Sequence, residues 1–93
     1  MFQNKINSLR TQIDVLDSQI LSLLNERFEY VLAIHNLKKQ FHLQKKDIER
    51  ENKIIENLIL SNKGKLSPRA ISSLFKNVIS VLLKEIPKNK KNP

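Results

Sequence analysis

The chain has 93 residues, a length that suffices for one domain with a small core. Its formal net charge is +8. It contains no cysteine, which excludes a disulfide framework and thiolate chemistry. No apolar run reaches the length of a membrane span, and the first five residues lack the apolar core of a signal sequence, so we expect a soluble, cytoplasmic protein.

The first predicted element is a long amphipathic helix over residues 6–39. Apolar residues recur there at every third or fourth position and form a seam, which consists of Ile6, Leu9, Ile13, Leu16, Ile20, Leu23, Tyr30, Ile34 and Leu37. We expect this helix to begin near Asn4 or Asn7, either of which can cap it, and to end near Lys39 or Gln40. Its length of roughly 50 Å exceeds the ~30 Å diameter of a compact domain of this size. We therefore predict a homodimer in which the long helices pack antiparallel.

A second helix is predicted after a short polar loop at residues 40–46. Asp47 is placed to cap its first turn, where a carboxylate accepts a backbone N–H. The apolar face of this helix consists of Ile48, Ile54, Ile55, Leu58 and Ile59. Asn62 and Lys63 lead to Gly64, which we expect to end the helix in the left-handed conformation.

A third helix is predicted to begin with Ser67 as its N-cap and Pro68 as its first residue, and to end at Pro87. Its apolar face consists of Ile71, Leu74, Phe75, Val78, Ile79, Leu82 and Ile86. We expect a helical domain over residues 1–86 and a basic, disordered tail over residues 87–93. The predicted fold class is all-α, with three helices per chain, one of them very long, in an intertwined antiparallel helical homodimer.

Arg27 interrupts the apolar seam of the first helix. Its guanidinium would be costly to bury unless an anion meets it. Arg27, Val31, Ile34 and Lys38 fall on one helical face, where two cations bracket an apolar patch that suits a small anionic molecule with an apolar middle. In an antiparallel dimer, Arg10 of the partner subunit lies beside this face, whereas Arg10 of the same chain is about 25 Å from Arg27. Two identical sites, each built from both chains, are therefore expected.

Asp47, Arg50 and Glu51 continue the polar constellation at the start of the second helix. Arg50 can bind a second carboxylate, and Glu51 or Asp47 can accept a hydrogen bond from a hydroxyl or orient the arginines. On residue pattern alone a structural interpretation stays open. In it Arg27 is a side chain paired with a nearby acid, Lys38 is a charge at a helix end, and the other three form a solvated first turn.

Other chemistry finds little support in the sequence. His35 and His42 have no carboxylate placed to complete a metal site, so no metal is expected. The positive charge raises the question of nucleic-acid binding. The distribution of the charge weakens that interpretation. Much of the excess positive charge lies in the loop and the tail, in Lys38, Lys39, Lys45, Lys46, Lys84, Lys88, Lys90 and Lys91.

Several motifs together are similar to those of a known family. The segments LRTQIDVLD at residues 9–17, NER at residues 25–27 and DIERE at residues 47–51, with Lys38 between them, resemble the all-helical (type II) chorismate mutases over residues 6 to about 79. The resemblance implies an intertwined homodimer with two active sites. It further implies conversion of chorismate to prephenate, in phenylalanine and tyrosine biosynthesis, without a cofactor or a covalent intermediate.

The resemblance also implies a role for each charged residue of the site. Arg10 of the partner chain, Arg27 and Arg50 would hold the substrate carboxylates or the groups around them, and Lys38 would meet a carboxylate and the ether oxygen. Glu51 would accept a hydrogen bond from the ring hydroxyl, with Asp47 nearby.

The third helix departs from the family pattern. The family usually has Gln or Glu eleven residues after the position of Phe75, where this chain has Ile86, and often Ser seven residues after it, where this chain has Leu82. Glu85 is adjacent but about 100° away around the helix. Three outcomes are therefore expected as alternatives: reduced activity, a Glu85 redirected by a local shift, or a chain that binds the ligand without turning it over well. Two alternatives are a related isochorismate-pyruvate lyase on the same fold, and a non-catalytic basic helical dimer that binds nucleic acid or protein.

Overall fold

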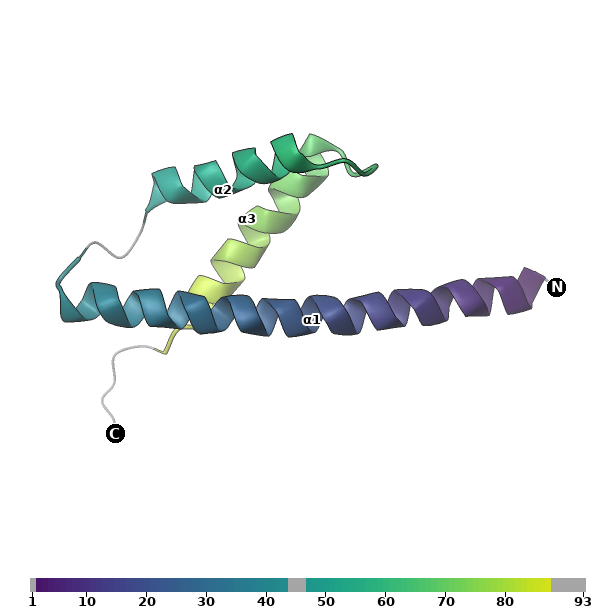
Figure 1. Cartoon of the computed structure of the whole chain (residues 1–93), viewed down its shortest axis with the longest axis horizontal. Helices are drawn as coiled ribbons and strands as arrows, with labels where there is room; N and C mark the ends of the chain where they lie inside the picture. The colour runs from purple at the N-terminus through teal and green to yellow at the C-terminus, as the bar shows by residue number, and fades with distance from the viewer. Residues whose placement is uncertain (1, 44–46, 88–93) are drawn as a thin grey trace. The chain divides into compact units, whose positions relative to one another are not determined.

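The computed structural model describes residues 2–43 and 47–87, and these residues form three α-helices and no strand (Figure 1). The helices are α1 (Phe2–Gln40), α2 (Ile48–Ser61) and α3 (Pro68–Glu85). The predicted all-α class, with one very long helix, is confirmed. Within the described ranges no helix is both long and apolar enough to cross a membrane. The chain divides into two compact units, Met1–Ala33 and Ile34–Pro93.

The first helix begins earlier than the sequence predicted. α1 already includes Phe2, so neither Asn4 nor Asn7 caps it, and that prediction was wrong. The side chain of Asn7 accepts a hydrogen bond from Gln3 Nε2 at 3.4 Å, and its carbonyl accepts one from Thr11 Oγ1 at 3.0 Å. No proline or glycine interrupts this stretch, and an asparagine inside a helix costs only a few tenths of a kcal/mol. The helix therefore runs through both candidate caps.

The end of α1 agrees with the prediction and is closed by His42. His42 has a φ of 58°, the left-handed region that glycine usually occupies at this position. Its N–H donates to the Lys39 carbonyl at 3.4 Å, and the N–H of Leu43 donates to the Lys38 carbonyl at 2.7 Å. These two bonds form a Schellman motif, which satisfies carbonyls that would otherwise have no partner at the helix end.

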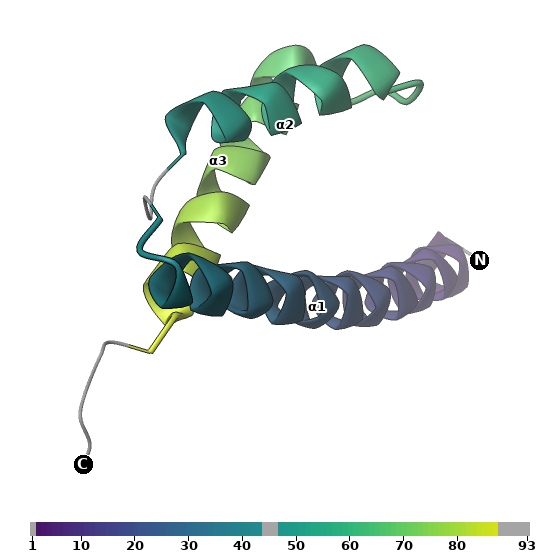
Figure 2. The same ribbon diagram turned by 60° about the vertical axis from the view of Figure 1, so that its left-hand side comes forward.

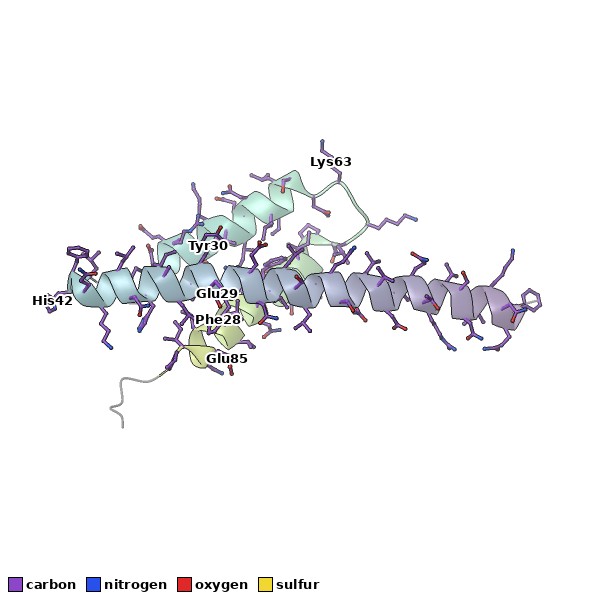
Figure 3. The ribbon with its side chains drawn as sticks, turned by 60° about the horizontal axis from the view of Figure 1, so that its bottom comes forward. Phe28, Glu29, Tyr30, His42, Lys63 and Glu85 are labelled. Carbon is purple, nitrogen blue, oxygen red and sulfur yellow. The ribbon has the colours of Figure 1, made fainter. Side chains whose placement is uncertain are left out.

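The surface of α1 is unusual because none of its residues is buried. From Ile6 to Leu23 the seam side chains are 41–65% exposed, and Tyr30 is 70% exposed. A second stripe is half-buried and consists of Leu24, Arg27, Phe28, Val31, Leu32, His35 and Lys38. Figure 3 shows Phe28 and Tyr30 on opposite sides of the helix. The single chain therefore leaves a long apolar stripe of α1 uncovered.

The core lies between α2 and α3. The described residues that are buried are Ile55 at 8% exposure, Ile71 at 5% and Ile79 at 7%, one from α2 and two from α3. Figures 1 and 2 show the two helices meeting at their connection and diverging toward the start of α2 and the end of α3. The start of α2 and the end of α3 are therefore the parts of the two helices that lie furthest apart.

The ends of α2 and α3 follow local chemistry. Asp47 Oδ1 accepts the Arg50 N–H at 3.0 Å, and Ser67 Oγ accepts the Ala70 N–H at 3.1 Å, so both predicted N-caps are confirmed. Pro68 is the first residue of α3. At its other end α3 stops at Glu85, two residues before Pro87, as predicted.

Gly64 does not end α2. No glycine in the described residues has a positive φ, so the predicted left-handed stop was wrong. The helix ends at Ser61, and Asn62 is extended. The Asn62 side chain holds the turn instead, because its Oδ1 accepts the Gly64 N–H at 3.0 Å and its Nδ2 donates to the Leu66 carbonyl at 2.9 Å. Residues 44–46 and 88–93 lie outside the described residues, so of the predicted tail only Pro87 is described.

Candidate active site

The first turn of α2 brings together three of the predicted site residues. The Asp47 carboxylate accepts the Arg50 N–H, and the Glu51 N–H donates to the Asp47 carbonyl at 3.1 Å. One carboxylate oxygen of Asp47 therefore caps the start of the helix. Arg50 is exposed, whereas Glu51 is half-buried. Because consecutive helical residues point about 100° apart, the two side chains leave α2 in different directions.

Arg50 faces a broad polar surface of α2. The side chains beside it are those of Asp47, Glu49, Asn52, Lys53 and Glu56. Lys53 Nζ lies 3.9 Å from Glu56 Oε1, a loose ion pair between two well-exposed side chains. This surface contains both signs of charge, so Arg50 is surrounded by acids as well as by lysine.

Glu51 lines the groove between α2 and α3, which has a volume of about 360 Å³. Apolar side chains make up about half of its lining, which consists of Ile48, Glu51, Asn52 and Ile55 from α2 and Lys76, Ile79, Ser80, Leu83 and Lys84 from α3. Among the described ion pairs, none joins Glu51 to Lys76 or Lys84. The groove therefore offers a carboxylate and two ammonium groups around an apolar surface.

The polar residues of α3 in this groove were missed by the sequence analysis. Lys76, Ser80 and Lys84 are spaced four residues apart, so they share one stripe of the helix. That spacing indicated a polar face of the helix, but a face that only contacts solvent has the same pattern. Only the packing of α3 against α2 shows that the stripe borders a groove.

The cations predicted on α1 differ in exposure. Arg10 is exposed, whereas Arg27 and Lys38 are half-buried. Arg10 and Arg27 belong to the first unit and Lys38 to the second. Along α1, Arg27 and Lys38 are about 16 Å apart, and Arg10 is about 25 Å from Arg27. Ile34, predicted on the same face as Arg27, is 53% exposed.

Neither Glu85 nor Ile86 is among the residues that line the α2–α3 groove. Glu85 is the last residue of α3 and is exposed (Figure 3). Ile86 is half-buried, and its N–H donates to the Leu83 carbonyl at 3.3 Å. In residues 2–43 and 47–87 no three His, Cys, Asp or Glu side chains gather as a metal site would require.

Comparison with known proteins gives the family. The model of the family "Chorismate mutase type II" matches residues 9–85, a range that includes Arg10, Arg27 and Lys38 of α1, the first turn of α2 and all of α3. The chain therefore belongs to the chorismate mutase type II family.

Two curated relatives are bifunctional chorismate mutase/prephenate dehydratases. The one from Enterobacter agglomerans is 35% identical over 95 residues, which cover 97% of this chain and 24% of the relative. The one from Escherichia coli (strain K12) is 35% identical over 78 residues, which cover 83% of this chain and 20% of the relative. The chain thus spans a quarter or less of the length of these relatives.

Two solved structures of the chorismate mutase from Thermus thermophilus are similar along nearly their whole length. Form I has a TM-score of 0.82 and 31% identity, and the match covers 84% of this chain and 98% of that chain. Form II has a TM-score of 0.86 and 29% identity, and the match covers 94% of this chain and 99% of that chain.

Proposed function

We propose that the chain rearranges chorismate to prephenate, a step of phenylalanine and tyrosine biosynthesis, in the cytoplasm. The family match over residues 9–85 carries the proposal, since that range contains every charged residue that the reaction requires of this chain. The relatives similar in sequence and the two similar structures are all described as chorismate mutases.

The chemistry suits a site without a nucleophile or a metal. In chorismate one ether C–O bond breaks while one C–C bond forms within the same molecule, so no group is transferred to the protein. The protein must hold a flexible dianion in a reactive conformation and stabilise the negative charge that grows on the ether oxygen. Fixed cations and an apolar wall supply both effects.

Six of the predicted residues have a place in this scheme within one chain. Arg27 and Arg50 bind substrate carboxylates, and Lys38 donates to a carboxylate and to the ether oxygen. Glu51, on the wall of the α2–α3 groove, accepts a hydrogen bond from the ring hydroxyl. Asp47 fixes the first turn of α2 through its bond to the Arg50 N–H. Ile34 contributes apolar contact.

The proposal includes a homodimer in which Arg10 of the partner subunit completes each site. The support is the exposed seam of α1, where six Leu and Ile side chains from Ile6 to Leu23 remain 41–65% exposed. Burying the rest of six such side chains contributes on the order of 5 kcal/mol per chain. An antiparallel copy would cover the seam and bring its Arg10 toward Arg27.

A turnover assay with purified chain tests the function. We expect chorismate to be lost and prephenate to form at equal rates, with at least a 100-fold lower rate for Arg27→Ala. A chain shortened to residues 1–86 should match the full chain, because the tail is outside the proposed domain. No turnover above the uncatalysed rate would contradict the proposal. Salicylate released from isochorismate would indicate the lyase, and salt-sensitive binding of DNA or RNA without turnover would indicate a binding protein.

A further inference from the structure

The groove between α2 and α3 has one end beside the first turn of α2. Because α2 and α3 run in opposite directions from a short connection, the start of α2 faces the end of α3, and the two diverge there (Figures 1 and 2). Ile48 from the first turn and Leu83 from the last turn both line this end. A molecule at this end of the groove would therefore contact both helices.

Two charged side chains line this end of the groove. Glu51 comes from the first turns of α2 and Lys84 from the last turn of α3. Lys76 lines the same groove but lies two turns, or about 12 Å, further toward the connection. No described ion pair joins Lys84 to Glu51, so both groups can bind a ligand. A carboxylate and an ammonium group on opposite walls can bind a hydroxyl and an anionic oxygen of one molecule.

The two residues that follow Lys84 are less well placed. The side chain of Ile86 has no hydrogen-bond donor, and Glu85 does not line the groove, whereas Lys84 does. Lys84 has a mobile ammonium with three donors, which a long flexible stem can direct into the groove.

We propose that Lys84 is the residue of α3 that contacts the substrate: its ammonium group donates to an anionic or ether oxygen while Glu51 binds the hydroxyl. This inference rests on the proposed function. It assigns to Lys84 a task that neither Glu85 nor Ile86 can perform. It also predicts that a neutral donor at position 86 has little to add while Lys84 is present.

Steady-state kinetics on matched variants test the assignment. We expect Lys84→Met to lower kcat/KM about 100-fold and Lys84→Arg to keep at least about a tenth of the wild-type value. Lys63→Met makes the same change of charge in the α2–α3 connection, outside the groove, and should stay within about threefold (Figure 3). Ile86→Gln should change the wild type by less than about threefold but raise Lys84→Met about tenfold. Circular dichroism should show the same helicity for all variants.

Two results would overturn the assignment. One is a Lys84→Met variant whose kcat/KM stays within about threefold of the wild-type value. The other is an Ile86→Gln chain whose kcat/KM is at least about tenfold above wild type, which would mean that no residue of the wild-type α3 donates to the substrate. Calorimetric titration with prephenate separates this failure from failure of the function. Binding that Lys84→Met weakens, in a chain without turnover, would support Lys84 and contradict catalysis. Turnover that Lys84→Met leaves unchanged would contradict Lys84 alone, and a chain with neither turnover nor binding would contradict both.

Discussion

Mixing two inactive variants tests whether each active site is shared between chains. Arg10 and Arg27 lie seventeen residues apart on one uninterrupted helix, which is about 25 Å. An extended arginine side chain reaches only about 7 Å from its backbone, so one small ligand cannot contact both residues of the same α1. In an antiparallel pair of α1 helices, Arg10 of one copy approaches the face that contains Arg27 and Lys38 of the other copy. Each site then needs Arg10 and Arg27 from different chains.

We therefore expect Arg10→Ala and Arg27→Ala to complement each other. Each variant alone should lose at least about 100-fold in chorismate turnover, because every site lacks one cation. After the two are unfolded together and refolded in equal amounts, half of the dimers contain one chain of each kind. Such a dimer has one site with both substitutions and one site with none, so the mixture should regain about a quarter of wild-type activity.

A second pair of variants is the matched control. Arg27→Ala and Lys38→Met remove two cations that we assign to the same chain's contribution, so their mixed dimers contain no intact site and should stay inactive. Native mass spectrometry confirms that mixed dimers have formed. If Arg10→Ala and Arg27→Ala form mixed dimers but recover no more than this control pair, the shared-site geometry is wrong.

Three further substitutions test how the α1 seam, the end of α1 and the core contribute to stability, all at a fixed chain concentration. Arg27→Leu should abolish turnover yet stabilise the dimer by about 1–2 kcal/mol, since it makes the seam continuous; a less stable dimer would refute this. His42→Gly should raise the free energy of unfolding by about 0.5–1 kcal/mol, because φ of 58° favours glycine, and a lower melting temperature would contradict it. Ile55→Ala should cost about 2–4 kcal/mol in urea unfolding, because Ile55 is 8% exposed in a small core; a loss under ~1 kcal/mol would count against that core.

The parts of the fold that local chemistry decides were predictable from the sequence. Asp47 and Ser67 cap their helices through bonds of 3.0 and 3.1 Å, as residues of their type do at such positions. Pro87 marks the end of α3 because proline cannot continue a helix. The two errors have different causes. Asn62 holds the turn that Gly64 was expected to make, and Asn7 remains helical because no residue stops the helix there.

The candidate site was predictable only in part, for a similar reason. Asp47, Arg50 and Glu51 form a recognisable cluster in sequence, and the structure places them in one turn. Lys84 was missed because the sequence analysis followed the apolar face of α3 to Ile86. Two helices that diverge expose residues at the border of that face, and the degree of divergence depends on packing between α2 and α3 rather than on the pattern of either helix.

The imbalance between exposed and buried apolar side chains connects folding, assembly and activity. Only three of the described residues are buried, whereas the Leu and Ile side chains of the α1 seam are at least 41% exposed. A second copy that covers this seam would supply the missing core and would also bring its Arg10 to Arg27. Since one contact provides both, dilution should remove the dimer, its helicity and its turnover over the same range of concentration. Isolated chains that kept their turnover would show that the site needs no partner.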